Sequence, residues 1–267
     1  MPYSDLCREK ILSENYHDFI VSDIRMPFLQ DMLEKDCCLQ NPGFFYQCAY
    51  LSKSVIKPVS LENYSYFSIP KCYSLLSMQA LNQAGILPIQ NHSTIQLSGK
   101  QVMIGFLDTG IDYQNPVFQH LDKTTRIAGI WDQTIQSGTP PESFDYGSHY
   151  TPDMINEALA SEDPYSLVPS VDNNGHGTFL ASIAAGSGDP DAQFIGAAPE
   201  SVIAVVKLKQ AKQYLRDYYF IPNTAPAFQE NDIMLGMRYL HLLAEKLGLP
   251  LIFCLALGSN LGGHSGS

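Results

Sequence analysis

Three uninterrupted apolar runs constrain the fold of this chain more than any other feature. They span residues 102–107, 202–206 and 251–257, and helical patterns lie between them. A strand that is buried on both faces of a parallel sheet reads as a continuous apolar run of this kind. The alternation of strands with helices therefore predicts an α/β fold, with a parallel sheet and helices on both of its faces.

Local signals place the helices between these strands. An apolar helix is expected over 179–185, and a short helix with a Thr-Pro start over 151–160. A longer helix is expected over 232–247, because Gly248 follows it in the C-cap position and Pro250 cannot continue it.

The first part of the chain has a different pattern. Residues 18–21 are strand-like, residues 44–59 are rich in Tyr, Phe, Val and Ile, and residues 72–84 have a helix-like pattern. We therefore treat residues 1–70 as a small N-terminal α+β unit, and residues 71–267 as part of the main domain.

Composition excludes several classes of protein. The 267 residues carry a formal net charge of −11 and no cluster of Lys or Arg, which argues against a nucleic-acid partner. No run of eighteen apolar residues occurs, so no membrane span is expected. Charges begin at Asp5, so we identify no signal peptide, and the six cysteines are interpreted as free thiols.

Two polar residues lie where folds of this class hold catalytic groups. Asp108 directly follows the first apolar run, and active sites of open α/β sheets lie at that carboxyl edge. His176 lies between two glycines at the start of an apolar helix, which can hold its ring rigidly as a general base. Each residue also has a structural interpretation, because Asp108 could cap a turn and a lone histidine is usually structural or solvated.

Both residues lie in motifs that resemble those of the subtilisin-like (subtilase) serine proteases. Residues 104–112 resemble the aspartate motif of that family, and residues 174–186 resemble its histidine motif. Residues 196–207 resemble the segment that comes next, and residues 256–259 resemble the strand that pairs with the substrate backbone. The four matches occur in the order of the family, over roughly 101–260.

The resemblance implies a mechanism of peptide-bond hydrolysis and the residues that carry it. Asp108 would fix the tautomer of His176 and stabilise its imidazolium, while His176 would take a proton from a serine hydroxyl and later give it to the leaving amine. Ala256, Leu257 and Gly258 would hold a protein or peptide substrate as an added strand.

No other residue or cofactor is assigned to the reaction. Asp112 is interpreted as a structural turn residue. Members of the family often bind calcium, but no acidic loop here has the ligand spacing of a calcium site, so no metal ligand is proposed.

Details of the sequence resemble one subgroup of the family, the clostridial Csp germination proteases. They lie at residues 130–135, 138–141 and 258–264. The two candidate residues are also 68 positions apart, more than in compact subtilases, so residues 113–172 are expected to form a surface insertion near the cleft. The resemblance implies a spore-associated protease that acts on the pro-segment of another protein. Because no signal peptide is identified, the expected location is cytoplasmic or spore-associated.

The family's nucleophile is not recognised in this sequence. Subtilases place it in a Gly-Thr-Ser motif that opens a long helix, after a strand that bears an oxyanion-hole Asn. Ser265 superficially resembles the serine of a Gly-x-Ser-x-Gly elbow, but Ser267 replaces the last glycine and no helix follows. We therefore interpret Ser265 as part of a loop that lines the substrate groove.

The consequence would be large, because loss of a triad nucleophile costs on the order of 10⁶ in turnover. The 267-residue chain alone is therefore expected to be inactive. The strand at 251–257 would also lack a full set of neighbours, which predicts either an exposed apolar surface or a partner that covers it, namely the missing C-terminal part or another chain.

Three interpretations follow from these features. The chain is the N-terminal fragment of a full subtilase, or a natural pseudoprotease that binds peptides or partners, or an α/β domain that is not a peptidase. For residues 1–70, an inhibitory prodomain and a simple extension packed on the core are equally open, because the family's two-helix, four-strand prodomain pattern is not clear.

Overall fold

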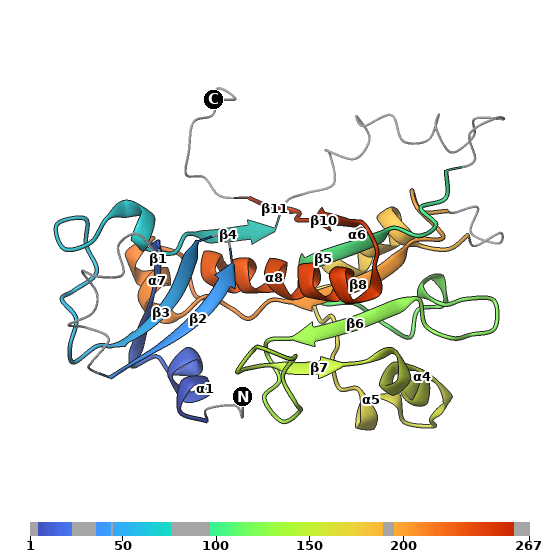
Figure 1. The fold of residues 1–267 in the computed structure, drawn as a ribbon, viewed down its shortest axis with the longest axis horizontal. Coiled ribbons are helices and arrows are strands. Elements are labelled where there is room, and N and C mark those ends of the chain that lie inside the picture. Colours follow the sequence, from blue (N-terminus) through green and yellow to red (C-terminus); the bar gives the residue numbers. More distant parts are fainter. Residues whose placement is uncertain (1–4, 23–35, 44, 76–96, 189–194, 259–267) are drawn as a thin grey trace.

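A computed structural model describes residues 5–22, 36–43, 45–75, 97–188 and 195–258. Within these ranges the chain forms a central five-stranded sheet and two smaller three-stranded sheets (Figure 1). One small sheet belongs to the N-terminal unit, and the other combines strands from distant parts of the chain.

The central sheet is parallel except at one edge. Its strands follow the order β10, β5, β8, β6, β7. They span Leu251–Cys254 (β10), Met103–Asp108 (β5), Val202–Lys207 (β8), Ile127–Asp132 (β6) and Ser148–Tyr150 (β7). Neighbouring strands are parallel apart from β6 and β7, which are antiparallel. The predicted parallel sheet is thus confirmed, with strands in all three apolar runs.

Helices cover both faces of this sheet, as predicted. On one face, Met103 and Leu107 of β5 pack in the cluster that includes buried residues of α8 (Glu230–Leu247). On the other face, Ile104 and Phe106 pack in the cluster shared by α4 (Pro152–Ala160) and α6 (His176–Ala185). The side chains of β5 alternate between the two clusters because successive residues of a strand point to opposite faces.

The helix boundaries follow from local chemistry. The hydroxyl of Thr151 accepts a hydrogen bond from Met154 N at the start of α4. Gly248 ends α8 in the left-handed conformation, with φ +66°, which is a common glycine C-cap. The helices predicted over 151–160, 179–185 and 232–247 are therefore present, with α6 and α8 starting a few residues earlier than expected.

The interpretation of 113–172 as a surface insertion is wrong in part. The strand β6 lies inside the central sheet between β8 and β7, and Trp131 within it is fully buried. The polar flanks of β6 hide its short apolar run in the sequence. The remaining elements of the segment include a 3-10 turn, η4 (Pro116–Phe118), and a short helix, α5 (Pro164–Leu167), as well as β7 and α4.

The N-terminal unit contains one helix and three antiparallel strands among its described residues. They span Asp5–Leu12 (α1), Tyr16–Ser22 (β1), Cys37–Gly43 (β2) and Tyr46–Ser52 (β3), in the sheet order β1, β3, β2. The strands expected over 18–21 and within 44–59 are present, whereas α1 and β2 were not predicted. The 3-10 turn η2 (Tyr66–Ser68) follows.

The expectation that all six cysteines are free thiols is wrong for one pair. Cys7 of α1 and Cys38 of β2 are joined as a disulfide, and their Cα atoms lie 5.4 Å apart. The pairing depends on how α1 packs against β2, which residue spacing does not reveal. Cys48, Cys72 and Cys254 are free thiols in the structure.

The remaining small sheet combines strands from distant parts of the main domain. Its middle strand is β4 (Cys72–Leu75), which pairs antiparallel with β11 (Leu257–Gly258) on one side and with β9 (Phe228–Gln229) on the other. The helix expected over 72–84 is therefore wrong for residues 72–75, and residues 76–84 lie outside the described part of the chain. Just before β9 comes the short helix α7 (Gln213–Tyr218).

Candidate active site

Asp108 is the last residue of β5, at the carboxyl edge of the central sheet. Its side chain is buried, and Oδ1 accepts a hydrogen bond from Thr109 N at 2.7 Å. Burial raises the pKa of Asp108, and the hydrogen bonds from His176 and Thr109 oppose that rise. The carboxylate is therefore held in one orientation by partners that favour its charged form.

His176 is the first residue of α6 and faces Asp108. Its Nδ1 atom lies 2.8 Å from Oδ1 and 3.0 Å from Oδ2 of that carboxylate. This contact makes Nδ1 the protonated nitrogen in the neutral ring, which leaves Nε2 as the basic atom. The structure thus brings the two candidate residues together as an aspartate–histidine pair that can act as a general base.

A close approach between the two motifs explains the glycine that follows His176. An added Cβ at Gly177 would lie only 2.2 Å from the carbonyl oxygen of Gly110. Gly175, which precedes His176, has φ +82° and serves as the N-cap of α6. The first glycine lets the chain turn into the helix, and the second lets the helix pack against the loop after β5.

The candidate substrate strand is occupied by another part of the chain. Leu257 and Gly258 form β11, and Ala256 directly precedes it. In β4, Leu75 pairs with Leu257 and Ser74 pairs with Gly258. An extended segment therefore already lies along the strand that sequence reasoning assigned to substrate binding.

The opposite side of β4 is also paired. Tyr73 pairs with Phe228 and Cys72 pairs with Gln229, both in β9. The Cys72 side chain is buried in a cluster with Leu215 and Ala227. Two edges, β9 and β11, thus hold one extended segment between them, which is how a peptide is bound by strand addition.

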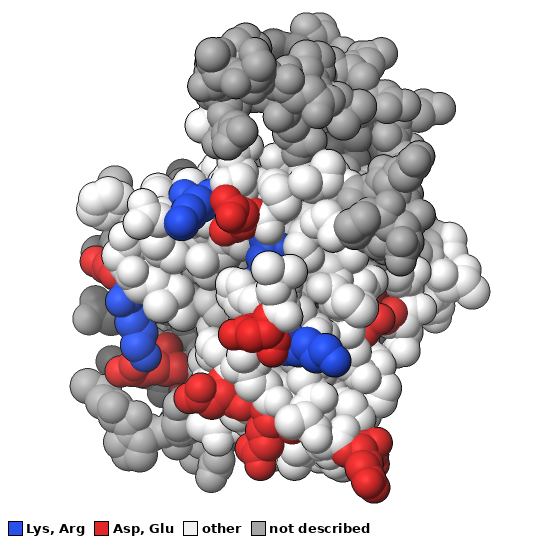
Figure 2. Space-filling view, turned by 90° about the vertical axis from the view of Figure 1, so that its right-hand side faces the viewer, with Lys and Arg blue, Asp and Glu red and all other residues white. Residues whose placement is uncertain are grey.

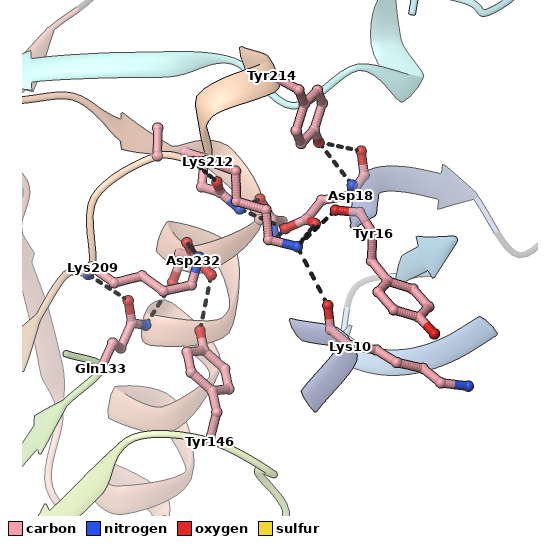
Figure 3. Close-up of polar contacts among 12 residues, drawn as sticks. Lys10, Tyr16, Asp18, Gln133, Tyr146, Lys209, Lys212, Tyr214 and Asp232 are labelled. Carbon is pink, nitrogen blue, oxygen red and sulfur yellow. Dashed lines mark hydrogen bonds and ion pairs between the residues drawn. The ribbon is translucent and has the colours of Figure 1, made fainter. Parts of the chain in front are cut away.

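The N-terminal unit docks against this region through buried charges. Asp18 of β1 forms an ion pair with Lys212, and both side chains are buried. Asp18 also accepts hydrogen bonds from Gln229 Nε2 at 2.6 Å and from Asn231 Nδ2 at 3.0 Å. Figure 3 shows Lys212 pointing at Asp18, with the hydroxyl of Tyr214 on the backbone of the same residue.

A second buried group lies beside it, at the start of α8. Asp232 pairs with Lys209 at 2.6 Å and accepts a hydrogen bond from the Tyr146 hydroxyl at 3.0 Å (Figure 3). The amide of Gln133 connects the two partners, because it donates to the backbone carbonyl of Asp232 and accepts from Lys209 N. Buried charges of this kind need such partners, because an isolated one costs several kcal/mol.

Sequence reasoning missed Asp18, Lys212 and the β4 segment. None of them belongs to a local motif, and their contacts span more than 150 residues of sequence. The burial of charged residues is visible only in the folded chain. Asp112 does act as a turn residue, since its carboxylate accepts a hydrogen bond from Gln114 N. Ser265 lies outside the described residues.

Neither a metal site nor a membrane-spanning helix is present among the described residues. Within them, no group of three or more His, Cys, Asp or Glu side chains is placed to hold a metal ion. No helix in the same part of the chain is long and apolar enough to cross a membrane. On the face shown in Figure 2, acidic side chains are widely spread, and basic ones form only small separate groups.

The aspartate–histidine pair and its surroundings match known proteins. Residues 99–233, half of the chain, match the model of the subtilase family. The chain is 32% identical over 131 residues to the subtilisin-like protease SBT2.2 of Arabidopsis thaliana, and 30% identical over 132 residues to SBT2.1 of the same plant. Each of these matches covers 42% of this chain but only 15% of the plant protein.

One solved structure is similar over a larger share. It is the CspB protease of Clostridium perfringens, with a TM-score of 0.54 and 34% identity. The match covers 68% of this chain and 33% of that protein. The family match includes the aspartate and histidine motifs, and the chain spans a minor part of the length of each relative.

Proposed function

This chain belongs to the subtilase family, and we propose that it supplies the Asp–His half of a serine endopeptidase site, together with the strands that bind substrate. The observation that carries this proposal is the contact of His176 Nδ1 with Asp108 at 2.8 Å. In the reaction, Asp108 holds the ring and stabilises the imidazolium. Nε2 of His176 takes the proton of a serine hydroxyl and later delivers it to the leaving amine.

The finer proposal is that the nucleophile comes from sequence outside the described residues. The described residues contain no Gly-Thr-Ser motif. In support, the strand β10 lies at an edge of the sheet, and Ile252, Phe253 and Leu255 are 57%, 38% and 41% exposed. Such an apolar edge fits a further parallel strand that brings the serine motif to the cleft, either in the same chain or in a partner.

The alternative is a pseudoprotease that binds peptides without cleaving them. The observation that favours it is the β4 segment, because β9 and β11 bind an extended backbone without any use of the Asp–His pair. This alternative shares the binding strands with the endopeptidase and differs only in the nucleophile. A spore-associated or cytoplasmic location, with a pro-segment of another protein as substrate, is part of the same proposal.

A fluorophosphonate probe that labels reactive serines tests the proposal. The 267-residue chain should not react, whereas a chain continued in frame through a Gly-Thr-Ser motif should be labelled. Labelling of the longer chain should be lost in His176→Ala and greatly slowed in Asp108→Asn, which favours the wrong tautomer and costs about 10⁴ in turnover in a serine protease. The matched control Asp112→Asn should react normally.

Two results would contradict the endopeptidase. Labelling of the 267-residue chain that disappears in Ser265→Ala would show that the nucleophile had been misassigned. A natural chain that continues without any Gly-Thr-Ser motif, and that binds peptides but never reacts with the probe, would favour the pseudoprotease.

We also propose that the N-terminal unit is an inhibitory prodomain. Support comes from the position of β4, which directly follows that unit and fills the space between β9 and β11. A segment held there competes with any substrate that binds by strand addition, because both use the same backbone groups.

A further inference from the structure

Asp172 lies between the aspartate and histidine motifs and contacts both of them. Its Oδ1 atom accepts a hydrogen bond from the Thr109 hydroxyl at 2.8 Å. Its Oδ2 atom accepts from the Thr178 hydroxyl at 2.7 Å and from Thr178 N at 2.8 Å. Thr109 directly follows Asp108, and Thr178 comes two residues after His176. One carboxylate therefore bonds to the immediate neighbours of both members of the pair.

The two threonine hydroxyls also link the aspartate and histidine motifs directly through hydrogen bonds. Thr109 Oγ1 donates to Asp172 and accepts a hydrogen bond from Gly177 N, which lies in the histidine motif, at 3.0 Å. Thr178 Oγ1 donates to Asp172 and accepts from Asp112 N, which lies in the aspartate motif, at 2.8 Å. Each hydroxyl donates its own hydrogen bond to Asp172, so its oxygen lone pairs can accept a hydrogen bond from the opposite motif. The carboxylate thereby fixes the direction of both links.

Further contacts hold the loop around His176. Asp172 Oδ1 also accepts hydrogen bonds from Gly175 N at 2.9 Å and from Asn174 N at 3.2 Å. Burial alone would raise the pKa of Asp172, but the hydrogen bonds from Thr178, Thr109 and Gly175 outweigh that effect and lower it. The side chain is thus a carboxylate at neutral pH, which can only accept hydrogen bonds.

The segment that carries Asp172 is itself anchored to the central sheet. Ser170 donates its hydroxyl proton to Asp132 Oδ2 at 2.7 Å, and Lys207 Nζ donates to the carbonyl of Val171 at 2.8 Å. Asp132 ends β6 and Lys207 ends β8, and the two side chains form an ion pair at 3.4 Å. Asp172 is therefore held from the carboxyl ends of β8, which neighbours the strand that bears Asp108, and of β6, the next strand in the sheet.

We propose that Asp172 is a positioning residue for the Asp108–His176 pair. It touches neither member of the pair with its side chain and acts by orienting Thr109 and Thr178, which lock the two motifs together. The inference rests on the proposed function, because positioning matters only if the pair acts as a base. A displacement of about 1 Å in a catalytic group can cost about a hundredfold in rate, which makes this support relevant to activity.

Nuclear magnetic resonance of the 267-residue chain tests the proposal without a nucleophile or a substrate. The signal is the downfield Nδ1 proton of His176, bonded to Asp108 and assigned by its absence in His176→Gln. In Asp172→Ala this resonance should be lost. In the matched control Asp122→Ala, which removes a carboxylate that accepts from Thr124 N and its hydroxyl in a distant exposed turn, it should be unchanged.

Two threonine variants keep the test valid if Asp172→Ala fails to fold. Thr178→Val should lose the resonance, while Thr178→Ser, which retains the hydroxyl, should keep it. Persistence of the signal in Asp172→Ala or in Thr178→Val would overturn the proposal, as would its loss in Asp122→Ala. The readout needs no serine. The outcome of this experiment therefore does not depend on whether the endopeptidase proposal is correct.

Discussion

The side chain of Gln229 donates a hydrogen bond to Asp18 at 2.6 Å, while the backbone of the same residue pairs with Cys72 in β4. One residue of the main domain thus contacts both the docked N-terminal sheet and the β4 segment that lies between β9 and β11. Because a shift of β9 would disturb both contacts, we expect the docking of the N-terminal unit and the pairing of β4 with β9 to be coupled.

Removal of the Asp18 carboxylate should strongly destabilise the protein. In Asp18→Ala, the Lys212 ammonium stays buried without its counter-ion, and Gln229 and Asn231 lose a shared acceptor. Breaking one partner of a buried ion pair typically costs about 3–5 kcal/mol. Urea unfolding at pH 7 should show a loss of this size.

A surface ion pair in the same unit provides the control for that measurement. Asp36 pairs with Lys10 at 2.7 Å but lies at an exposed position. Asp36→Ala should therefore cost much less than Asp18→Ala, since exposed pairs contribute little. Equal losses from the two variants would contradict the role of the buried pair in docking.

Disruption of β4 should open the strand-binding site to a peptide in trans. Ser74 pairs with Gly258, so Ser74→Pro removes a backbone N–H from the middle of the three-stranded sheet. A fluorescent peptide with the sequence of residues 70–77 should then bind saturably, as measured by anisotropy. In the unchanged protein it should bind far more weakly, because the tethered segment competes at an effective concentration on the order of millimolar.

The control for this experiment is the same peptide with proline at the position that corresponds to Ser74. It should fail to bind the Ser74→Pro protein if the interaction uses backbone hydrogen bonds. Equal binding of the natural peptide to the variant and to the unchanged protein would instead show that β4 does not block the site.

The parts of the site that were predictable are those encoded by neighbours in the sequence. Asp108 follows a continuous apolar run, and His176 lies between two glycines at a helix start, so each motif can be recognised locally. The same holds for β5 and β8, because burial on both faces leaves a run without polar residues. The strand β10 has a similar apolar run, although it lies at the edge of the sheet and Ile252 and Phe253 are exposed.

What could not be predicted depends on contacts between distant residues. The strand β4 has a local helix-like pattern, and only its pairing with β9 and β11 makes it extended. Asp172 lies in a polar stretch where an aspartate is ordinary, and its role becomes visible only when Thr109 and Thr178 converge on it.

Stability should fall as the pH is lowered from 7 to 5, partly because of His17. Burial, with a further contribution from nearby Lys53, lowers the pKa of His17 to about 4, and its ring stacks on Tyr214 at 3.8 Å. Asp18 raises this pKa and Lys212 lowers it further. The unfolded chain therefore binds more protons than the folded chain between the ordinary pKa of histidine and pH 4, so stability decreases with falling pH.

The size of this effect is about 1 kcal/mol between pH 7 and pH 5, since the ring is only partly buried. His17→Phe keeps a ring on Tyr214 but cannot take up a proton, so its unfolding midpoint in urea should fall less between these pH values. The exposed His120 serves as the control, and His120→Gln should respond to pH as the unchanged protein does. Identical pH responses of His17→Phe and the unchanged protein would rule out this explanation.

Gly177→Ala should move the aspartate and histidine motifs apart. The added Cβ would lie 2.2 Å from Gly110 O and 3.1 Å from both Gly110 N and Asp108 Cβ, and the backbone of Gly110 has little freedom to relax. Overpacking of this kind costs about 1–3 kcal/mol, and here the shift falls directly on the Asp108–His176 contact. Thermal unfolding should show the loss of stability, and the Nδ1 proton signal of His176 should disappear with it.

Gly248→Ala is the matched control, because that position has φ +66° but nothing within 4 Å of an added Cβ. Gly248→Ala should lose about 1 kcal/mol of stability from backbone strain and keep the Nδ1 proton signal. A retained signal in Gly177→Ala would contradict the prediction, because it would show that the Asp108–His176 contact tolerates the added methyl group.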